Sequence, residues 1–103
     1  MSRLQQLQQM LLDEPDDSFL NYALALEFAK EDNLPQAISI IEKVIQHNEN
    51  YLGAYYQLGK LYEQQNLSEK AISIYRKGIA IAQAQNNKKA QGELSEALWM
   101  LED

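Results

Sequence analysis

The chain matches itself when it is shifted by 34 residues. Residues 18–51 and 52–85 then share eight identical positions, among them the run Ala37–Ile40 against Ala71–Ile74, where chance pairing at average residue usage would give about two. A chain with this period must build two copies of one small unit, and neither copy can bury its apolar face alone. The sequence therefore predicts a repeat protein.

The first helix of each unit is marked by apolar residues at regular intervals. In the first unit Leu20, Leu24 and Phe28 recur every four residues, which places them on one face of a helix. Asp17 or Ser18 precedes this stripe, and either side chain can cap the first turn by accepting a backbone N–H hydrogen bond. The matching residues of the second unit are Tyr55, Leu58, Gly59 and Tyr62.

The second helix of each unit follows a short polar break. Pro35 suits its first turn, where the missing N–H of proline is not needed, and the polar run 47–50 ends it, because Asn competes for backbone hydrogen bonds. No stretch alternates as an exposed strand would, so we expect an all-α fold. The predicted buried faces are Ala37, Ile41, Val44 and Ile45, and then Ala71, Ile74, Tyr75, Gly78 and Ala82.

A 34-residue helix–turn–helix unit of this kind resembles the tetratricopeptide repeat. The family pattern has an aromatic residue, Leu three positions on, a small residue next, Tyr three on, Ala nine on and an aromatic four on. The resemblance implies a right-handed superhelical array, in which the small residue, Ala25 or Gly59, faces the Ala of the second helix so that the two helices approach closely. The second unit matches at Tyr55, Leu58, Gly59, Tyr62, Ala71 and Tyr75, and the first at Leu24, Ala25, Phe28 and Ala37.

The same register extends to both sides of the two repeats. Pro15 takes the position of the family's terminal proline, and Leu7, Met10 and Leu11 then take the core face of a second helix. A C-terminal stripe follows the repeats, but Leu94 would fill its small position, so we expect a solvating cap there. That stripe is Ala90, Leu94, Ala97, Leu98 and Leu101. The expected single domain thus consists of a half-repeat helix (1–17), repeat one (18–51), repeat two (52–85) and a capping helix (86–103).

Composition excludes most kinds of site chemistry. The chain has no cysteine and a single histidine, His47, which excludes disulfides, thiol nucleophiles and multi-histidine metal cages. Its four glycines stand singly, without a phosphate-binding loop, and no serine has the flanking glycines of a nucleophile elbow. We expect a protein that is not an enzyme and uses no cofactor.

The charge balance narrows the class of partner. Fifteen acids against nine bases give a net charge of -6, and nucleic acids and anionic membranes are bound by clustered Lys and Arg instead. No apolar run reaches the 18 or so residues of a spanning helix, and the first residues lack the apolar core of a signal peptide. We therefore expect a cytoplasmic protein that binds neither nucleic acid nor membrane.

Binding of a protein or peptide partner is the function that the resemblance implies. The first helices of the family line a concave groove, and two groove positions carry Tyr22 and Tyr56, whose rings offer rigid contact area and a hydroxyl. The hypothesis is an adaptor or assembly factor, without the Lys and Asn carboxylate clamp of chaperone-binding members, whose positions here hold Tyr22, Leu26 and Gln57. The groove positions are Phe19, Tyr22, Leu26, Gly53, Tyr56, Gln57 and Lys60. The alternative is that the half-repeat helix or the cap covers part of this stripe as core.

Self-association is the competing interpretation. Trp99 and Met100 lie off the main stripe of the C-terminal helix, so they either wrap the edge of the core or form an exposed patch. An uncovered apolar patch at the end of a repeat array can pair with another chain. A weak homo-oligomer built through the terminal helix or the groove is therefore the second hypothesis.

Overall fold

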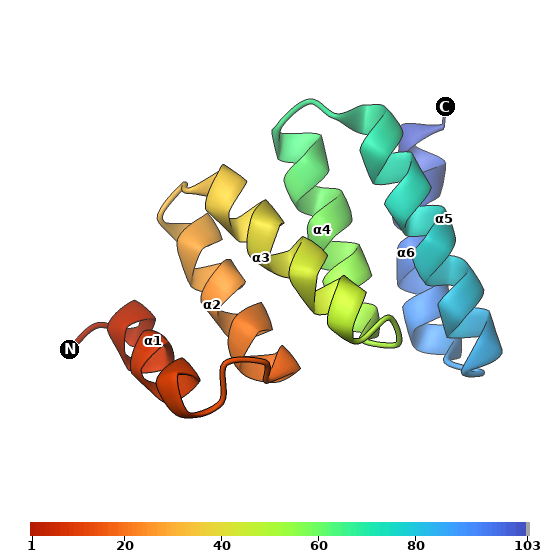
Figure 1. The fold of residues 1–103 in the computed structure, drawn as a ribbon. Coiled ribbons are helices and arrows are strands. Elements are labelled where there is room, and N and C mark those ends of the chain that lie inside the picture. The colour runs from red at the N-terminus through yellow and green to blue at the C-terminus, as the bar shows by residue number, and fades with distance from the viewer. Residues whose placement is uncertain (103) are drawn as a thin grey trace. The chain divides into compact units, whose positions relative to one another are not determined.

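Six α-helices make up the fold in the computed structural model, which describes residues 1–102 (Figure 1). They are α1 (Arg3–Asp13), α2 (Ser18–Lys30), α3 (Leu34–His47), α4 (Leu52–Gln64), α5 (Ser68–Ala84) and α6 (Lys88–Leu101). No strand occurs among the described residues, and the predicted all-α fold is confirmed. The chain divides into two compact units: unit one (1–49) holds α1 to α3, and unit two, which begins at Asn50, holds α4 to α6. Within the described part of the chain, no helix is long and apolar enough to cross a membrane.

Local side chains define where several of these helices start. The Asp17 carboxylate accepts a hydrogen bond of 2.8 Å from the backbone N–H of Leu20, which makes Asp17 the N-cap of α2. Pro35 lies in the first turn of α3, as predicted. The Asn87 side chain caps α6 by accepting a hydrogen bond of 3.0 Å from the N–H of Ala90. Capping satisfies donors that the first turn of a helix leaves without a partner.

Three of the inter-helix turns share one backbone geometry. Asp32, Asn66 and Asn86 each adopt a positive φ, between 56° and 62°, a conformation that Asn and Asp tolerate better than other residues with side chains. The residue after each of them returns a hydrogen bond to the preceding helix; for example, the N–H of Leu67 donates to the carbonyl of Tyr62 at 2.8 Å. This is the Schellman arrangement of a helix C-terminus. The polar breaks in the sequence are therefore specific turn signals.

The core of unit one lies around α2, which packs against both α1 and α3. Its cluster consists of Leu7, Leu20, Ala23 and Leu24, with Leu4, Leu11, Phe28 and Ile40 partly buried around it. The predicted face of α3 is buried as expected. The prediction for α1 was wrong at one residue, because the side chain of Met10 is 53% exposed instead of belonging to the core. No other helix of unit one packs on the side of α1 where Met10 lies.

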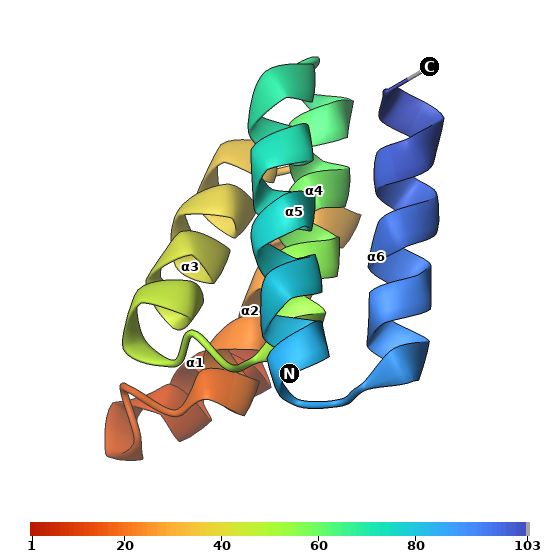
Figure 2. The same cartoon turned by 90° about the vertical axis from the view of Figure 1, so that its right-hand side faces the viewer.

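Unit two is a three-helix unit in which α5 packs against both α4 and α6 (Figure 2). Its largest fully buried side chains are Tyr55, Leu58, Tyr75 and Leu94. Two glycines allow these side chains to fit: a Cβ at Gly59 would lie 2.1 Å from the Tyr75 ring, and a Cβ at Gly78 would lie 2.8 Å from the Cβ of Tyr55 and 3.1 Å from Leu94.

These contacts add two details to the sequence interpretation. The space left by Gly59 is filled by the ring of Tyr75, which lies one turn of α5 beyond the buried Ala71 that the resemblance sets opposite Gly59. Leu94, which the sequence pattern set at the small position of the C-terminal stripe, is 1% exposed because Gly78 on α5 makes room for it. In each pair a glycine on one helix makes room for a large side chain on the next: Gly59 on α4 for Tyr75 on α5, and Gly78 on α5 for Leu94 on α6.

Candidate partner-binding face

The seven predicted groove residues lie in two sets, one in each unit. Unit one carries three of them on α2: Phe19 is 60% exposed, while Tyr22 and Leu26 are half-buried. The core that α1 helps to form uses the other stripe of α2, at Leu20 and Leu24. The burial of Phe19 under the half-repeat helix, which was the alternative reading, does not occur in unit one.

Unit two carries the other four on α4. Gly53 is exposed, and Tyr56, Gln57 and Lys60 are half-buried. Gly53 and Tyr56 line a recess of about 260 Å³ between the first half of α4 and the start of α6. The other lining residues are Leu52, Asn87, Lys89, Ala90, Glu93 and Leu94. The recess therefore combines apolar and aromatic walls with charged and amide groups, the mixture found in most binding pockets.

The Tyr56 ring is held in place by two neighbours. Its centroid lies 6.4 Å from that of Tyr75, with the ring planes tilted by 46°, which is within the range of favourable aromatic pairs. The Lys60 Nζ lies 5.4 Å from the centroid of the Tyr56 ring, at cation–π distance. A side chain fixed in this way loses little conformational freedom when a partner binds.

Lys60 is less available to a ligand carboxylate than the sequence suggested. Its Nζ lies 3.8 Å from the Glu63 carboxylate one turn along α4. The same carboxylate accepts a hydrogen bond of 2.5 Å from the hydroxyl of Tyr75 on α5. The charge of Lys60 is therefore shared with an intramolecular partner, and the cation that lines the recess itself is Lys89 on α6.

The hydroxyl of Tyr75 gives the protein a predictable response to alkaline pH. Burial, together with the Glu63 carboxylate, raises the pKa of Tyr75 well above its ordinary value of 10.0. The folded state thus keeps Tyr75 neutral where the unfolded chain ionises it, so this contribution to stability is present below about pH 10 and is lost above it. We expect the free energy of unfolding to fall by up to about 1.4 kcal/mol per pH unit more steeply above about pH 10 in the wild type than in Tyr75→Phe. Urea unfolding of the two proteins across this range tests the prediction, and identical pH profiles would contradict it.

Sequence reasoning missed the contribution of α6. The C-terminal helix was interpreted as a solvating cap and as a possible self-association surface, and none of its residues was assigned to the groove, yet Lys89, Ala90 and Glu93 line the recess together with residues of α4. Their spacing of one, three and four residues was a usable signal, because it places Lys89 and Glu93 on the same side of the helix as Ala90, which belongs to the predicted C-terminal stripe.

Comparisons with known proteins agree with this repeat geometry. The family model described as "Tetratricopeptide repeat" matches residues 28–94. A tetratricopeptide repeat domain protein from Salinibacter ruber, solved by NMR, is 38% identical with a TM-score of 0.83, and the match covers 86% of this chain and 90% of that one. No protein with a curated description matches this chain.

Two more distant solved structures share the fold. A protein from Bordetella parapertussis is 23% identical with a TM-score of 0.85, over 98% of this chain and 88% of that one. The TPR2B domain of yeast Sti1, solved in a pHsp70 complex, is 18% identical with a TM-score of 0.88, over 96% of this chain and 79% of that one. Together with the family match over residues 28–94 and the repeated helix pairs, these findings show that the chain belongs to the tetratricopeptide repeat family.

Proposed function

We propose that the protein is an interaction module without catalytic activity, which acts in the cytoplasm as an adaptor or assembly factor and binds a segment of a partner protein. The observation that carries the proposal is the recess between α4 and α6, whose lining includes the aromatic ring of Tyr56 and the exposed Gly53. A tetratricopeptide repeat domain with this fold, from yeast Sti1, was solved in a complex with pHsp70. Family membership thus supports the class of function, and the recess supports its position.

The lining of the recess suggests what kind of segment it accepts. Tyr56, Ala90 and Leu94 offer apolar contact, whereas Lys89 and Glu93 on α6 carry opposite charges one helical turn apart. We therefore expect a peptide that inserts one apolar side chain and presents polar or charged groups beside it. A contact with so few fixed residues should bind with a Kd of about micromolar strength.

Two substitutions in the lining of the recess test the proposal. Peptides selected on the wild-type protein from a random display library are titrated against Gly53→Leu, which fills the recess, and Tyr56→Ala, which removes its wall. We expect each variant to weaken binding by about tenfold or more, a loss of about 1.4 kcal/mol. Ser73→Leu is the matched control, because it adds the same side chain at an exposed position of α5 and should bind like the wild type.

Circular dichroism separates loss of binding from loss of fold. Tyr56→Ala also removes the ring contact with Tyr75, so Gly53→Leu is the more decisive variant. Wild-type affinity in a folded Gly53→Leu protein would exclude the recess as the binding position.

Tyr22→Ala tests separately the sequence-based prediction that Tyr22 of unit one takes part in binding.

A further inference from the structure

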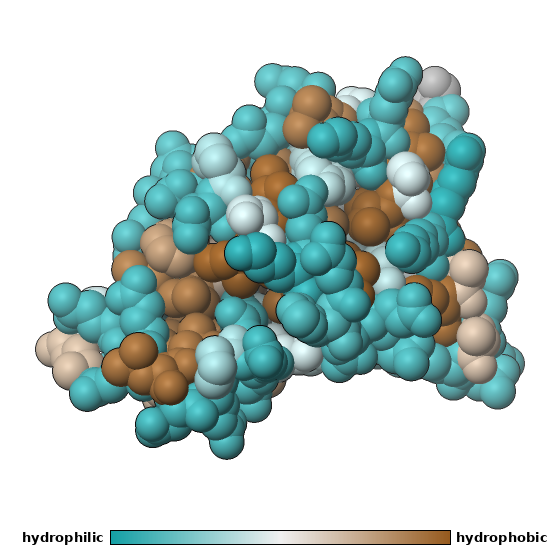
Figure 3. Space-filling model, in the orientation of Figure 1, coloured by the Kyte–Doolittle hydropathy of each residue, from teal (hydrophilic) through white to brown (hydrophobic). Residues whose placement is uncertain are grey.

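The exposed apolar side chains of the chain concentrate on two helices. Among the described residues, seven large hydrophobic side chains are exposed, and five of them lie on or directly beside α1 and α6. These five are Met1, Met10, Leu12, Trp99 and Met100. Figure 3 shows apolar surface of unit one open to solvent where α1 meets α2. Patches of this kind on otherwise polar proteins mark interaction surfaces.

The open side of α1 corresponds to a covered side of α3. With the 34-residue shift, Met10 corresponds to Val44 and Asp13 to His47. Val44 is only 3% exposed because α3 packs against α2, whereas Met10 is 53% exposed. An open hollow lined by Gln6, Gln9, Met10 and Asp13 marks this side of α1. Thus α1 has the pattern of a second helix of a repeat, with nothing in unit one packed where its first helix would lie.

The open side of α6 corresponds in the same way to a covered side of α4. Counted from the first residue of each helix, Leu94 matches Leu58, and both are buried. In this alignment Ser95, and not Leu94 as in the sequence register, takes the position of Gly59, the small residue over which α5 packs. Ser95 and Leu98 are only half-buried. Thus α6 has the pattern of a first helix of a repeat, with a small residue at the position of closest approach and a side that no helix of unit two covers fully.

We propose that α6 of one copy and α1 of a second copy pack antiparallel as the two helices of one composite repeat. Unit one supplies the template, because the start of α2 (Ser18, Asn21) and the end of α3 (Val44, His47) line a common hollow. We transfer the α2–α3 contact to the composite repeat, with α6 in the place of α2 and α1 in the place of α3. Lys88 then takes the position of Ser18, and Asp13 takes the position of His47. The pairing therefore sets Lys88 of one copy beside Asp13 of the other.

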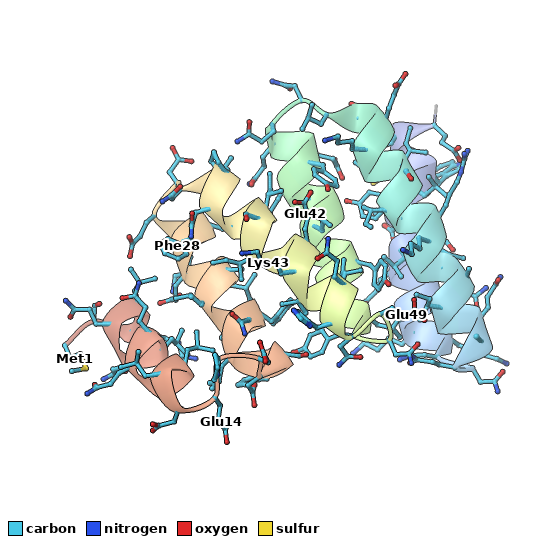
Figure 4. The ribbon with its side chains drawn as sticks, in the orientation of Figure 1. Met1, Glu14, Phe28, Glu42, Lys43 and Glu49 are labelled. Atoms are coloured by element: carbon cyan, nitrogen blue, oxygen red, sulfur yellow. The ribbon has the colours of Figure 1, made fainter. Side chains whose placement is uncertain are left out.

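Charge complementarity selects a second copy as the occupant. The start of α6 carries Lys88 and Lys89, and the end of α1 carries Asp13 followed by Glu14. Among the described residues, none of these four side chains takes part in a salt bridge. Figure 4 shows Met1 at one end of α1 and Glu14 at the other. Arg3, near the first of these ends, would lie toward Glu102 after α6, a carboxylate that also pairs with Arg76, so an antiparallel pair opposes unlike charges at both ends.

The contact joins two different surfaces, so it is heterologous and can add further copies at either side. A single helix pair buries less than the roughly 1,200 Å² of a stable complex, so we expect weak association that rises with protein concentration. It should weaken as salt screens the exposed charges. Of the four charged residues that carry this contact, Lys89 also lines the recess between α4 and α6. The association is measured without a peptide, so it does not depend on the proposed function.

Sedimentation velocity from micromolar to millimolar protein tests the pairing with two charge-reversal variants. Lys88→Glu/Lys89→Glu and Asp13→Lys/Glu14→Lys should each raise the dissociation constant at least tenfold when alone. An equimolar mixture of the two should associate again, because each then meets an oppositely charged partner. Lys43→Glu/Lys77→Glu is the control; it changes the net charge as much as the first variant, at exposed positions of α3 and α5, and should associate like the wild type.

Three results would overturn the proposal. A wild-type protein that stays monomeric at millimolar concentration excludes it directly. A symmetric α6–α6 dimer would leave Asp13→Lys/Glu14→Lys associated while Trp99→Ser dissociates. A mixture of the two reversed variants that remains monomeric would show that these charges do not face each other.

Discussion

Replacing Gly59 with alanine is expected to lower the free energy of unfolding by about 2 kcal/mol or more, although alanine is the better helix former by about 1 kcal/mol. The added Cβ would lie 2.1 to 2.7 Å from three carbons of the Tyr75 ring. That ring is fully buried, and its hydroxyl is fixed on Glu63, so it cannot move aside without disrupting the interface of α4 and α5. Chemical denaturation followed by circular dichroism measures the loss.

The same substitution at Gly92 supplies the matched control. Nothing lies within 4 Å of a Cβ built there, so Gly92→Ala should raise the free energy of unfolding by about 0.5–1 kcal/mol through helix propensity alone. If Gly→Ala lowers the free energy of unfolding at position 59 and raises it at position 92, the difference reports the contact with Tyr75. Equal effects at the two glycines would mean that the Gly59 contact does not limit packing.

Unit one suggests how the damage can be repaired. At the two positions that correspond to Gly59 and Tyr75 it carries Ala25 and Ile41, both fully buried. Unit two thus pairs a very small residue, Gly59, with a large one, Tyr75, whereas unit one fills the same two positions with Ala25 and Ile41, whose sizes lie between those two. We expect Tyr75→Ile to recover much of the stability lost in Gly59→Ala when the two changes are combined, as a double-mutant cycle would measure.

Leu94→Ala is expected to cost about 2–4 kcal/mol, because it empties a site that is 1% exposed. The side chain of Leu94 fits against Gly78 on α5, and a glycine offers no side chain that could relax into the space. The matched control on the same helix is Met100→Ala. Since Met100 is largely exposed, its loss should change stability by less than about 0.5 kcal/mol.

Denaturation at low protein concentration, where association is negligible, compares the two variants. A similar small change in both would show that α6 does not depend on Leu94 for its packing on unit two. Leu94 also lines the recess beside Tyr56, so peptide affinity should fall together with the stability of α6.

Sequence reasoning could predict the helices because several of their ends have a local chemical signal. Asp17 accepts its capping hydrogen bond, Pro35 lies in the first turn of α3, and the polar turns place Asn or Asp where the backbone needs a positive φ. The second repeat carries another copy of the turn signal, at Asn66, whereas Tyr51 and Glu69 stand at the positions of Asp17 and Pro35. Local signals of this kind act within a few residues, so they remain readable without a three-dimensional structure.

Sequence reasoning could not predict which side chain fills which space. Periodicity shows that Gly59 lies on a buried face, but the residue that covers it, Tyr75, belongs to another helix whose rotation is set by packing. The same reason explains Met10, which has a core-like position in the repeat and no helix beside it in unit one. The part played by α6 in the recess also depends on how α4 and α6 approach within unit two, which the spacing of their residues does not determine.

The most direct test of the proposed function is an NMR titration of isotope-labelled protein with a peptide selected on the wild type. We expect the largest amide shift changes to cluster on the lining of the recess, at Gly53, Tyr56, Lys89, Ala90 and Glu93, and to disappear in Gly53→Leu. Shift changes that cluster instead on the exposed outer side of α5, around Ser73 and Lys77, would contradict partner binding between α4 and α6.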